Sequence, residues 1–135
     1  METRDSQLIA LRPEIASARV NDSMSTEEQF QNGTLRPVAK LQNDLLVEAF
    51  CNYITKHKNV FYNLTIDRRM EYIANAIQKD IKFRNSLKGM IIGQFTVDEY
   101  RTYIQNSSAL NKRMMNLVKE RIQSNIQLLE KEMVV

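Results

Sequence analysis

The chain has a helical pattern of hydrophobic and polar positions. From Leu35 to the end, apolar side chains recur three and four positions apart, and strict alternation of apolar and polar residues is almost absent. This spacing places apolar side chains on one face of an α-helix. The sequence therefore predicts an all-α protein, a compact helical bundle of five or six helices, with residues 34–135 as its helical domain.

Residues 1–33 form an N-terminal arm with weaker signals. Ser25 stands three residues before Glu28, the spacing of a capping box, and Asn32-Gly33 is typical of a helix end, so we predict one short helix between them. Pro13 can open a turn or two. No long apolar stripe runs through residues 1–24, so this part of the arm is expected to be loosely ordered.

The first helix of the body is predicted from Thr34 to about Lys56. Pro37 falls in its first turn, where a missing N–H does no harm. Its apolar stripe is expected to face the core. The stripe consists of Val38, Leu41, Leu45, Leu46, Ala49, Phe50, Tyr53 and Ile54.

The middle of the body contains two further predicted helices. Thr65 begins a helix that continues to Gly93 with a bend near Asp80. Thr96 and Glu99 repeat the capping-box spacing and begin a short helix that ends before Asn106. The segments 64–88 and 95–119 align with an offset of 31 residues, so an internal duplication is a further hypothesis.

The last helix is predicted to start near Ser107 and to continue without a break through Met133. At ~1.5 Å per residue it would be ~39 Å long, about as long as the domain is wide. Its apolar side chains form a heptad-like seam that ends in an exposed apolar segment, which indicates self-association as a homo-oligomer. The candidate residues for this contact are Met115, Val118, Ile122, Asn125, Ile126, Leu129 and Met133.

Charge gives the second functional hypothesis. The formal net charge of +3 divides into −3 for residues 1–33 and +6 for residues 34–135. Basic side chains on two of the predicted helices could form one surface that contacts nucleic-acid phosphates. They are Lys79, Lys82, Arg84, Lys88, Lys112, Arg113, Lys119 and Arg121. The preferred interpretation remains a helical interaction module, whose protein partner the sequence does not identify.

The sequence has no recognisable pattern of catalytic or metal-binding residues. His57 is the only histidine and Cys51 the only cysteine, and neither has a partner at the spacing that a metal site or an activated nucleophile needs. We therefore predict no cofactor and no catalytic residues. Neither a secretory signal nor an apolar run long enough to span a membrane is evident, so a cytoplasmic protein is expected.

Four segments carry a resemblance to known proteins: residues 33–46, 56–62, 79–89 and 103–115. Over nearly its whole length the chain resembles a family of short bacterial helical proteins of unknown function, many of which bear the name glyoxalase. The resemblance implies a glyoxalase-type lyase as a third functional alternative. It transfers no site residue, because metal-dependent glyoxalases use several His and Glu ligands and this chain has one histidine.

Overall fold

The all-α prediction is confirmed by a computed structural model that describes residues 3–129. No strand occurs in this part of the chain. The structure has more helices than the five or six expected, because the arm holds an additional helix and two predicted helices are each divided. The α-helices are α1 Arg4–Leu11, α2 Thr26–Phe30, α3 Arg36–Leu41, α4 Asn43–Lys56, α5 Ile66–Lys79, α6 Ile81–Ile92, α7 Val97–Ile104 and α8 Ser107–Ser124.

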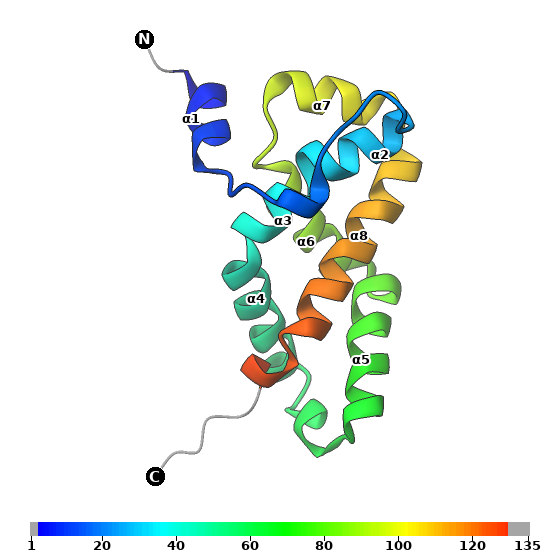
Figure 1. Cartoon of the computed structure of the whole chain (residues 1–135). Helices are drawn as coiled ribbons and strands as arrows, with labels where there is room; N and C mark the ends of the chain where they lie inside the picture. Colours follow the sequence, from blue (N-terminus) through cyan, green and yellow to red (C-terminus); the bar gives the residue numbers. More distant parts are fainter. Residues whose placement is uncertain (1–2, 130–135) are drawn as a thin grey trace.

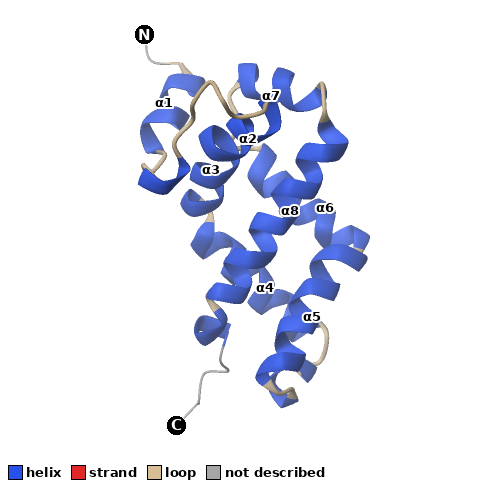
Figure 2. Ribbon diagram, turned by 45° about the vertical axis from the view of Figure 1, so that its right-hand side comes forward, coloured by secondary structure: helices blue, strands red, loops and turns tan. Residues whose placement is uncertain are grey.

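Helix α8 is the central element of the bundle. Figure 1 shows it between α4 and α5, and it packs against α3, α4, α5, α6 and α7. Figure 2 shows the same central position after a 45° turn. Its fully buried side chains meet a group of aromatic rings from α4 and the following loop, among them Phe50 and Phe61, whose ring centroids are 5.8 Å apart. Burial of this apolar surface is the main stabilising contribution to the fold.

Side-chain caps fix several of the helix starts. The Thr65 hydroxyl accepts a hydrogen bond from the backbone N–H of Arg68, and Thr96 forms a capping box with Glu99. These two predicted starts are confirmed. Asp80 ends α5 and caps α6 by accepting from the N–H of Phe83, so the predicted bend is a complete break between two helices. The caps satisfy backbone donors that a helix start would otherwise leave unpaired.

The helix boundaries at residues 32–42 differ from the prediction. Asn32-Gly33 does not end a helix, because residues Gln31–Leu35 continue α2 as a π-helix that leads into α3. Thr34 is buried inside this turn and is no N-cap. The predicted single helix is divided at Gln42, whose backbone leaves the helical region and whose side chain donates to the Met90 carbonyl at 2.8 Å.

The end of α8 also corrects the prediction. The helix stops at Ser124, which makes it ~27 Å long at ~1.5 Å per residue. Asn125 ends it, because its side-chain amide donates to the Arg121 carbonyl at 2.6 Å and so competes with the backbone. A 3₁₀ turn, Ile126–Leu129, then brings Leu129 into the core, where it is fully buried.

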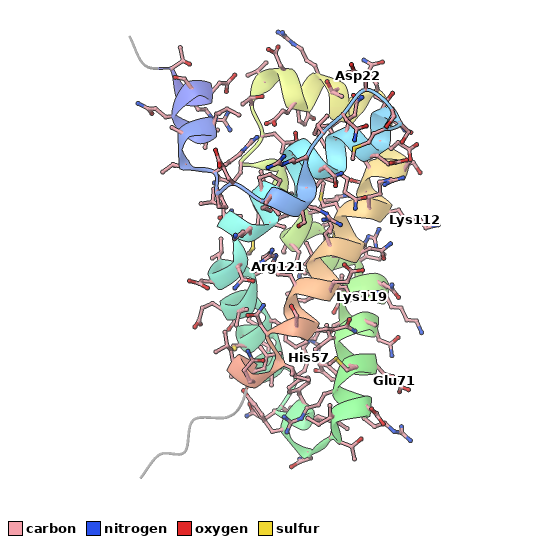
Figure 3. The ribbon with its side chains drawn as sticks, in the orientation of Figure 1. Asp22, His57, Glu71, Lys112, Lys119 and Arg121 are labelled. Atoms are coloured by element: carbon pink, nitrogen blue, oxygen red, sulfur yellow. The ribbon has the colours of Figure 1, made fainter. Side chains whose placement is uncertain are left out.

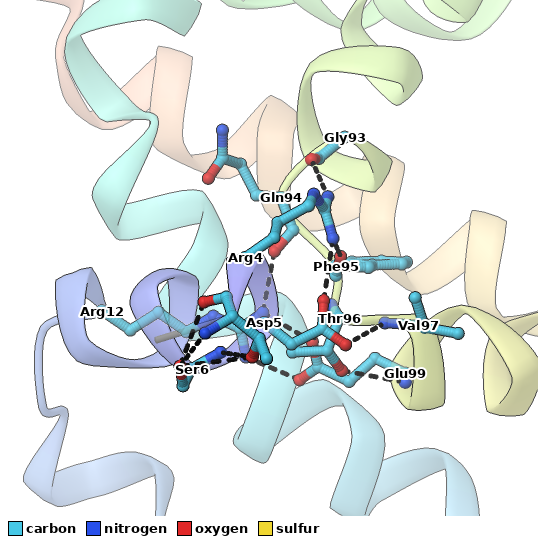
Figure 4. Close-up of polar contacts among 11 residues, drawn as sticks. Arg4, Asp5, Ser6, Arg12, Gly93, Gln94, Phe95, Thr96, Val97 and Glu99 are labelled. Carbon is cyan, nitrogen blue, oxygen red and sulfur yellow. Dashed lines mark hydrogen bonds and ion pairs between the residues drawn. The ribbon is translucent and has the colours of Figure 1, made fainter. Parts of the chain in front are cut away.

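The N-terminal arm contacts the body more closely than predicted. Helix α1 has no buried side chain, yet polar side chains of its first turn reach the loop before α7 and the start of α7 (Figure 4). Arg4 donates to the carbonyls of Gly93 and Phe95, and the Asp5 carboxylate accepts from the Val97 N–H. The sequence signal for α1 was the Thr3 and Ser6 pair, which forms a capping box.

Arg12 and Glu99 form the innermost contact of the arm. Both guanidinium Nη atoms donate to the Glu99 carboxylate at 2.6 Å, and the side chains are only 7% and 17% exposed. Glu99 also accepts from the Thr34 hydroxyl and the Thr96 N–H. Burial alone would raise the pKa of Glu99, but these hydrogen bonds and the charge of Arg12 outweigh it and lower the pKa.

The proposed duplication finds no support in the helix boundaries. The two segments share threonine caps at Thr65 and Thr96. With the 31-residue offset, however, the break at Asp80 aligns with Asn111, which lies inside α8. The similarity is therefore that of two capped helix starts, which resemble one another because threonine caps helices well.

Candidate functional site

Two of the eight predicted basic residues are engaged in contacts within the chain. Arg113 is paired with Glu27 and donates to Gln31, and Arg121 donates to Asn43 at the start of α4. Figure 3 shows Lys112 pointing away from the molecule, whereas Arg121 lies on the side of α8 toward α4. The sequence pattern placed these cations on two helices but did not show which of them the fold engages in contacts of its own.

The predicted self-association seam is part of the core of its own chain. Met115, Val118, Ile122 and Leu129 are each at most 2% exposed. Ile126 packs against the same core, and Asn125 is the helix end described above. Met133 lies outside the described residues. The prediction of an exposed contact seam is therefore wrong, because these side chains belong to the core that α8 shares with the helices packed against it.

An open groove lies instead between α4 and α6. It forms a cavity of about 570 Å³ with apolar side chains from both helices, Leu45 and Ala49 on α4 and Phe83 and Met90 on α6. Leu45 is 47% exposed and Ala49 half-buried, so these two positions of the predicted core stripe are not in the core. This volume is typical of small-molecule and peptide-side-chain sites.

Hydrogen bonds across the two helices hold both ends of the groove. At one end the Gln42 amide donates to the Met90 carbonyl at 2.8 Å. At the other end the Tyr53 hydroxyl donates to the Asp80 carboxylate at 3.0 Å. These contacts join the two helices at either end of the groove, which reduces the ordering that a ligand must impose.

Aromatic rings form the wall at the Tyr53 end. The Tyr53 ring stacks on Phe83 with centroids 4.3 Å apart, and His57 lies over its other side at 4.1 Å. Burial, together with the hydrogen bond to Asp80, raises the pKa of Tyr53 to about 12. The backbone N–H of Phe83 and the Tyr53 hydroxyl lower the pKa of Asp80. Tyr53 thus stays protonated and Asp80 ionised at neutral pH, so the pair is a fixed polar contact and a poor proton relay.

The same end of the groove is rich in basic side chains. Lys56 and Lys82 line the groove, and Lys79 lines an adjoining hollow of about 390 Å³ that shares Tyr53 and Asp80 with it. Within residues 3–129, no carboxylate lies within 4.0 Å of these three ammonium groups. Positive charge is therefore available to an anionic group of a ligand.

Neither cysteine nor histidine chemistry is favoured by the geometry. Burial and the nearby charge of Glu48 raise the pKa of Cys51, so its thiol is not activated as a nucleophile. His57 lies at the end of α4 (Figure 3), with its ring tilted against that of Tyr53. In the described part of the chain, no group of three or more His, Cys, Asp or Glu side chains could hold a metal ion.

The sequence identified two of the basic residues at this end, Lys79 and Lys82, but not the groove. The apolar residues of α4 cover a wider part of the helix surface than the face that packs in the core. Leu45 and Ala49 lie outside that face, on the groove side. A helix that is apolar over a wide arc is the signal that was available.

Comparison with known proteins identifies no relative of the chain. No family model, curated protein or solved structure matches the chain. Within residues 3–129, none of the helices combines the length and the apolar character needed to cross a bilayer.

Proposed function

We propose that this chain is a helical interaction module that binds its partner in the groove between α4 and α6. The observation that carries the proposal is the groove itself, an open cavity of about 570 Å³ held at both ends by hydrogen bonds between the two helices. It combines an apolar floor with lysines at one end that pair with no carboxylate among residues 3–129. A site of this kind takes a ligand that has an apolar part and a negative group.

Binding is favoured over catalysis by the state of the polar groups in the groove. Tyr53 and Asp80 hold each other in fixed protonation states, and the Asp80 carboxylate is also engaged as the cap of α6. The groove therefore offers recognition groups: aromatic faces, an apolar floor and ammonium donors. The proposal keeps the interaction module that the sequence indicated. It places the contact surface on α4 and α6 and no longer on the last helix.

The test uses the fluorescent dye anilinonaphthalene sulfonate, which has apolar rings and one negative group. We expect saturable binding to the folded protein, with affinity reduced severalfold by Leu45→Gln and also by Lys82→Gln. The matched control is Ile104→Gln, an equally exposed apolar residue on α7, which should bind like the wild type. Circular dichroism verifies that each variant is folded.

Two results would overturn the proposal. The first is dye binding that Leu45→Gln and Ile104→Gln change equally, because the dye would then be reporting exposed apolar surface in general. The second is salt-sensitive binding of RNA or DNA that depends on Lys112 and Lys119 and not on Leu45, which would favour the nucleic-acid alternative.

A further inference from the structure

We infer that the partner in the α4–α6 groove is an amphipathic α-helix of another protein, with acidic residues at the end that lies beside Lys56 and Lys82. This inference rests on the proposed function and specifies its ligand. It follows from the length of the groove, from the distribution of charge along it and from the hydrogen bonds that join its two helices.

The groove is longer than a small molecule requires. On α4 its lining runs from Leu45 to His57, residues twelve positions apart, which is ~18 Å along the helix axis. The lining residues of α4 recur at three and four positions, so they form a continuous stripe, and Phe83 and Met90 face it from α6. Two neighbouring helices with an apolar furrow between them are the usual receptor for a third helix that inserts its own apolar stripe.

The charges along the groove differ from one end to the other. Leu45, Ala49 and Met90 make the first half apolar, with Glu48 as its charged rim residue. The second half carries Lys56, His57 and Lys82, and the Asp80 carboxylate there is already engaged by Tyr53 and the Phe83 N–H. A complementary helix has apolar anchors throughout, acidic side chains at the lysine end and a basic side chain near Glu48. This arrangement also sets the direction in which the helix lies.

The apolar floor of the groove is open along its length among the described residues. The Gln42 to Met90 and Tyr53 to Asp80 hydrogen bonds join α4 to α6 at either end and leave the apolar floor between them uncovered by the described residues. Leu45, 47% exposed, is the principal anchor on the α4 side, because it is the large apolar side chain of the floor with the most surface still to bury.

The experiment measures the affinity of designed peptides by fluorescence anisotropy with the whole chain. Each peptide has about 16 residues and one leucine stripe, long enough to follow the groove. One peptide has a glutamate cluster at its C-terminal end, a second has it at its N-terminal end, and a third has lysines in its place. We expect one acidic peptide to bind at least tenfold more tightly than the lysine peptide, with affinity that falls as salt increases.

Variants of the protein locate the contact. Lys56→Gln together with Lys82→Gln should weaken the acidic peptide about three- to tenfold and remove most of its salt dependence. Leu45→Gln should weaken all leucine-stripe peptides, whereas Ile104→Gln should weaken none. Melting curves followed by circular dichroism confirm that the variants fold.

Three outcomes would overturn the inference. Equal binding of the lysine and glutamate peptides would contradict the charge argument. Dye binding at Leu45 with no binding of any peptide would leave the proposed function in place and remove the helix as its ligand. Concentration-dependent dimerisation in analytical ultracentrifugation that Leu45→Gln abolishes would make a second copy of the chain the occupant.

Discussion

Glu99 shows how one carboxylate can join segments that lie far apart in the sequence. It accepts hydrogen bonds from Arg12 in the arm, from Thr34 in the π-helix and from the Thr96 N–H at the start of α7. Sequence analysis identified Glu99 only as a capping-box residue. The longer-range role was not predictable, because spacing reports local hydrogen bonds and says nothing about a guanidinium 87 positions away.

At the scale of this contact we predict that Arg12→Ala destabilises the protein by about 3–5 kcal/mol at neutral pH, because it leaves the Glu99 charge buried without its partner. The folded-state pKa of Glu99 is lowered from 4.5, so the stabilisation by the ionised group is present above about pH 4.5 and is lost as pH falls through the folded-state pKa. The difference between wild type and variant should therefore shrink in acid. Urea denaturation over a pH series measures it.

The control for this prediction is Arg101→Ala. Arg101 pairs with Asp98 across side chains that are 72% and 93% exposed, and such surface pairs contribute at most about 1 kcal/mol. If Arg12→Ala and Arg101→Ala have the same small effect at every pH, the buried contact does not stabilise the arm.

At the scale of helices, side-chain hydrogen bonds decide where elements begin and end. The starts at Thr65 and Thr96 were predictable, because a cap lies within a few residues of the backbone groups it satisfies. The breaks at Gln42 and Asn125 were not. Gln42 reaches Met90, and the Asn125 amide donates to Asn43 as well as to the local Arg121 carbonyl. The contacts to Met90 and Asn43 depend on the tertiary arrangement.

Helix α6 provides an element-scale prediction at its two glycines. A Cβ atom added at Gly89 would meet no atom within 4 Å, so Gly89 does not mark a close helix crossing. Gly89→Ala should stabilise the protein by about 0.5–1 kcal/mol, because alanine loses less conformational entropy in a helix. Chemical denaturation monitored by circular dichroism tests this expectation.

Gly93→Ala, at the C-cap that follows α6, is the matched comparison. An added Cβ there would lie 3.1 Å from the Gly89 carbonyl oxygen, closer than ordinary contact. We expect this variant to gain less stability than Gly89→Ala or to lose some. A larger gain at Gly93 than at Gly89 would show that the local packing argument is wrong.

For the whole molecule, the helical class followed from the period of the apolar residues, but the division of apolar side chains between core and surface did not. Leu45 and Ile122 both belong to predicted stripes, yet Leu45 lines the groove and Ile122 is fully buried. The period of the apolar residues identifies the apolar face of a helix, but it does not show which other element packs against that face. The helices packed against α8 bury its seam in the common core, while no described element covers the groove between α4 and α6.

The last prediction concerns this division between core and surface. Ile122→Ala should destabilise the chain by about 2–5 kcal/mol in one cooperative transition, because it opens a cavity where α8 meets the other helices. Leu128→Ala, six residues on and 55% exposed, should change the free energy of unfolding by less than about 0.5 kcal/mol. Denaturation at two protein concentrations distinguishes burial of Ile122 within its own chain from burial against a second copy. A midpoint that rises with concentration in the wild type and not in Ile122→Ala would mean that the side chain is buried against a second copy, as the sequence pattern had indicated, and not within its own chain.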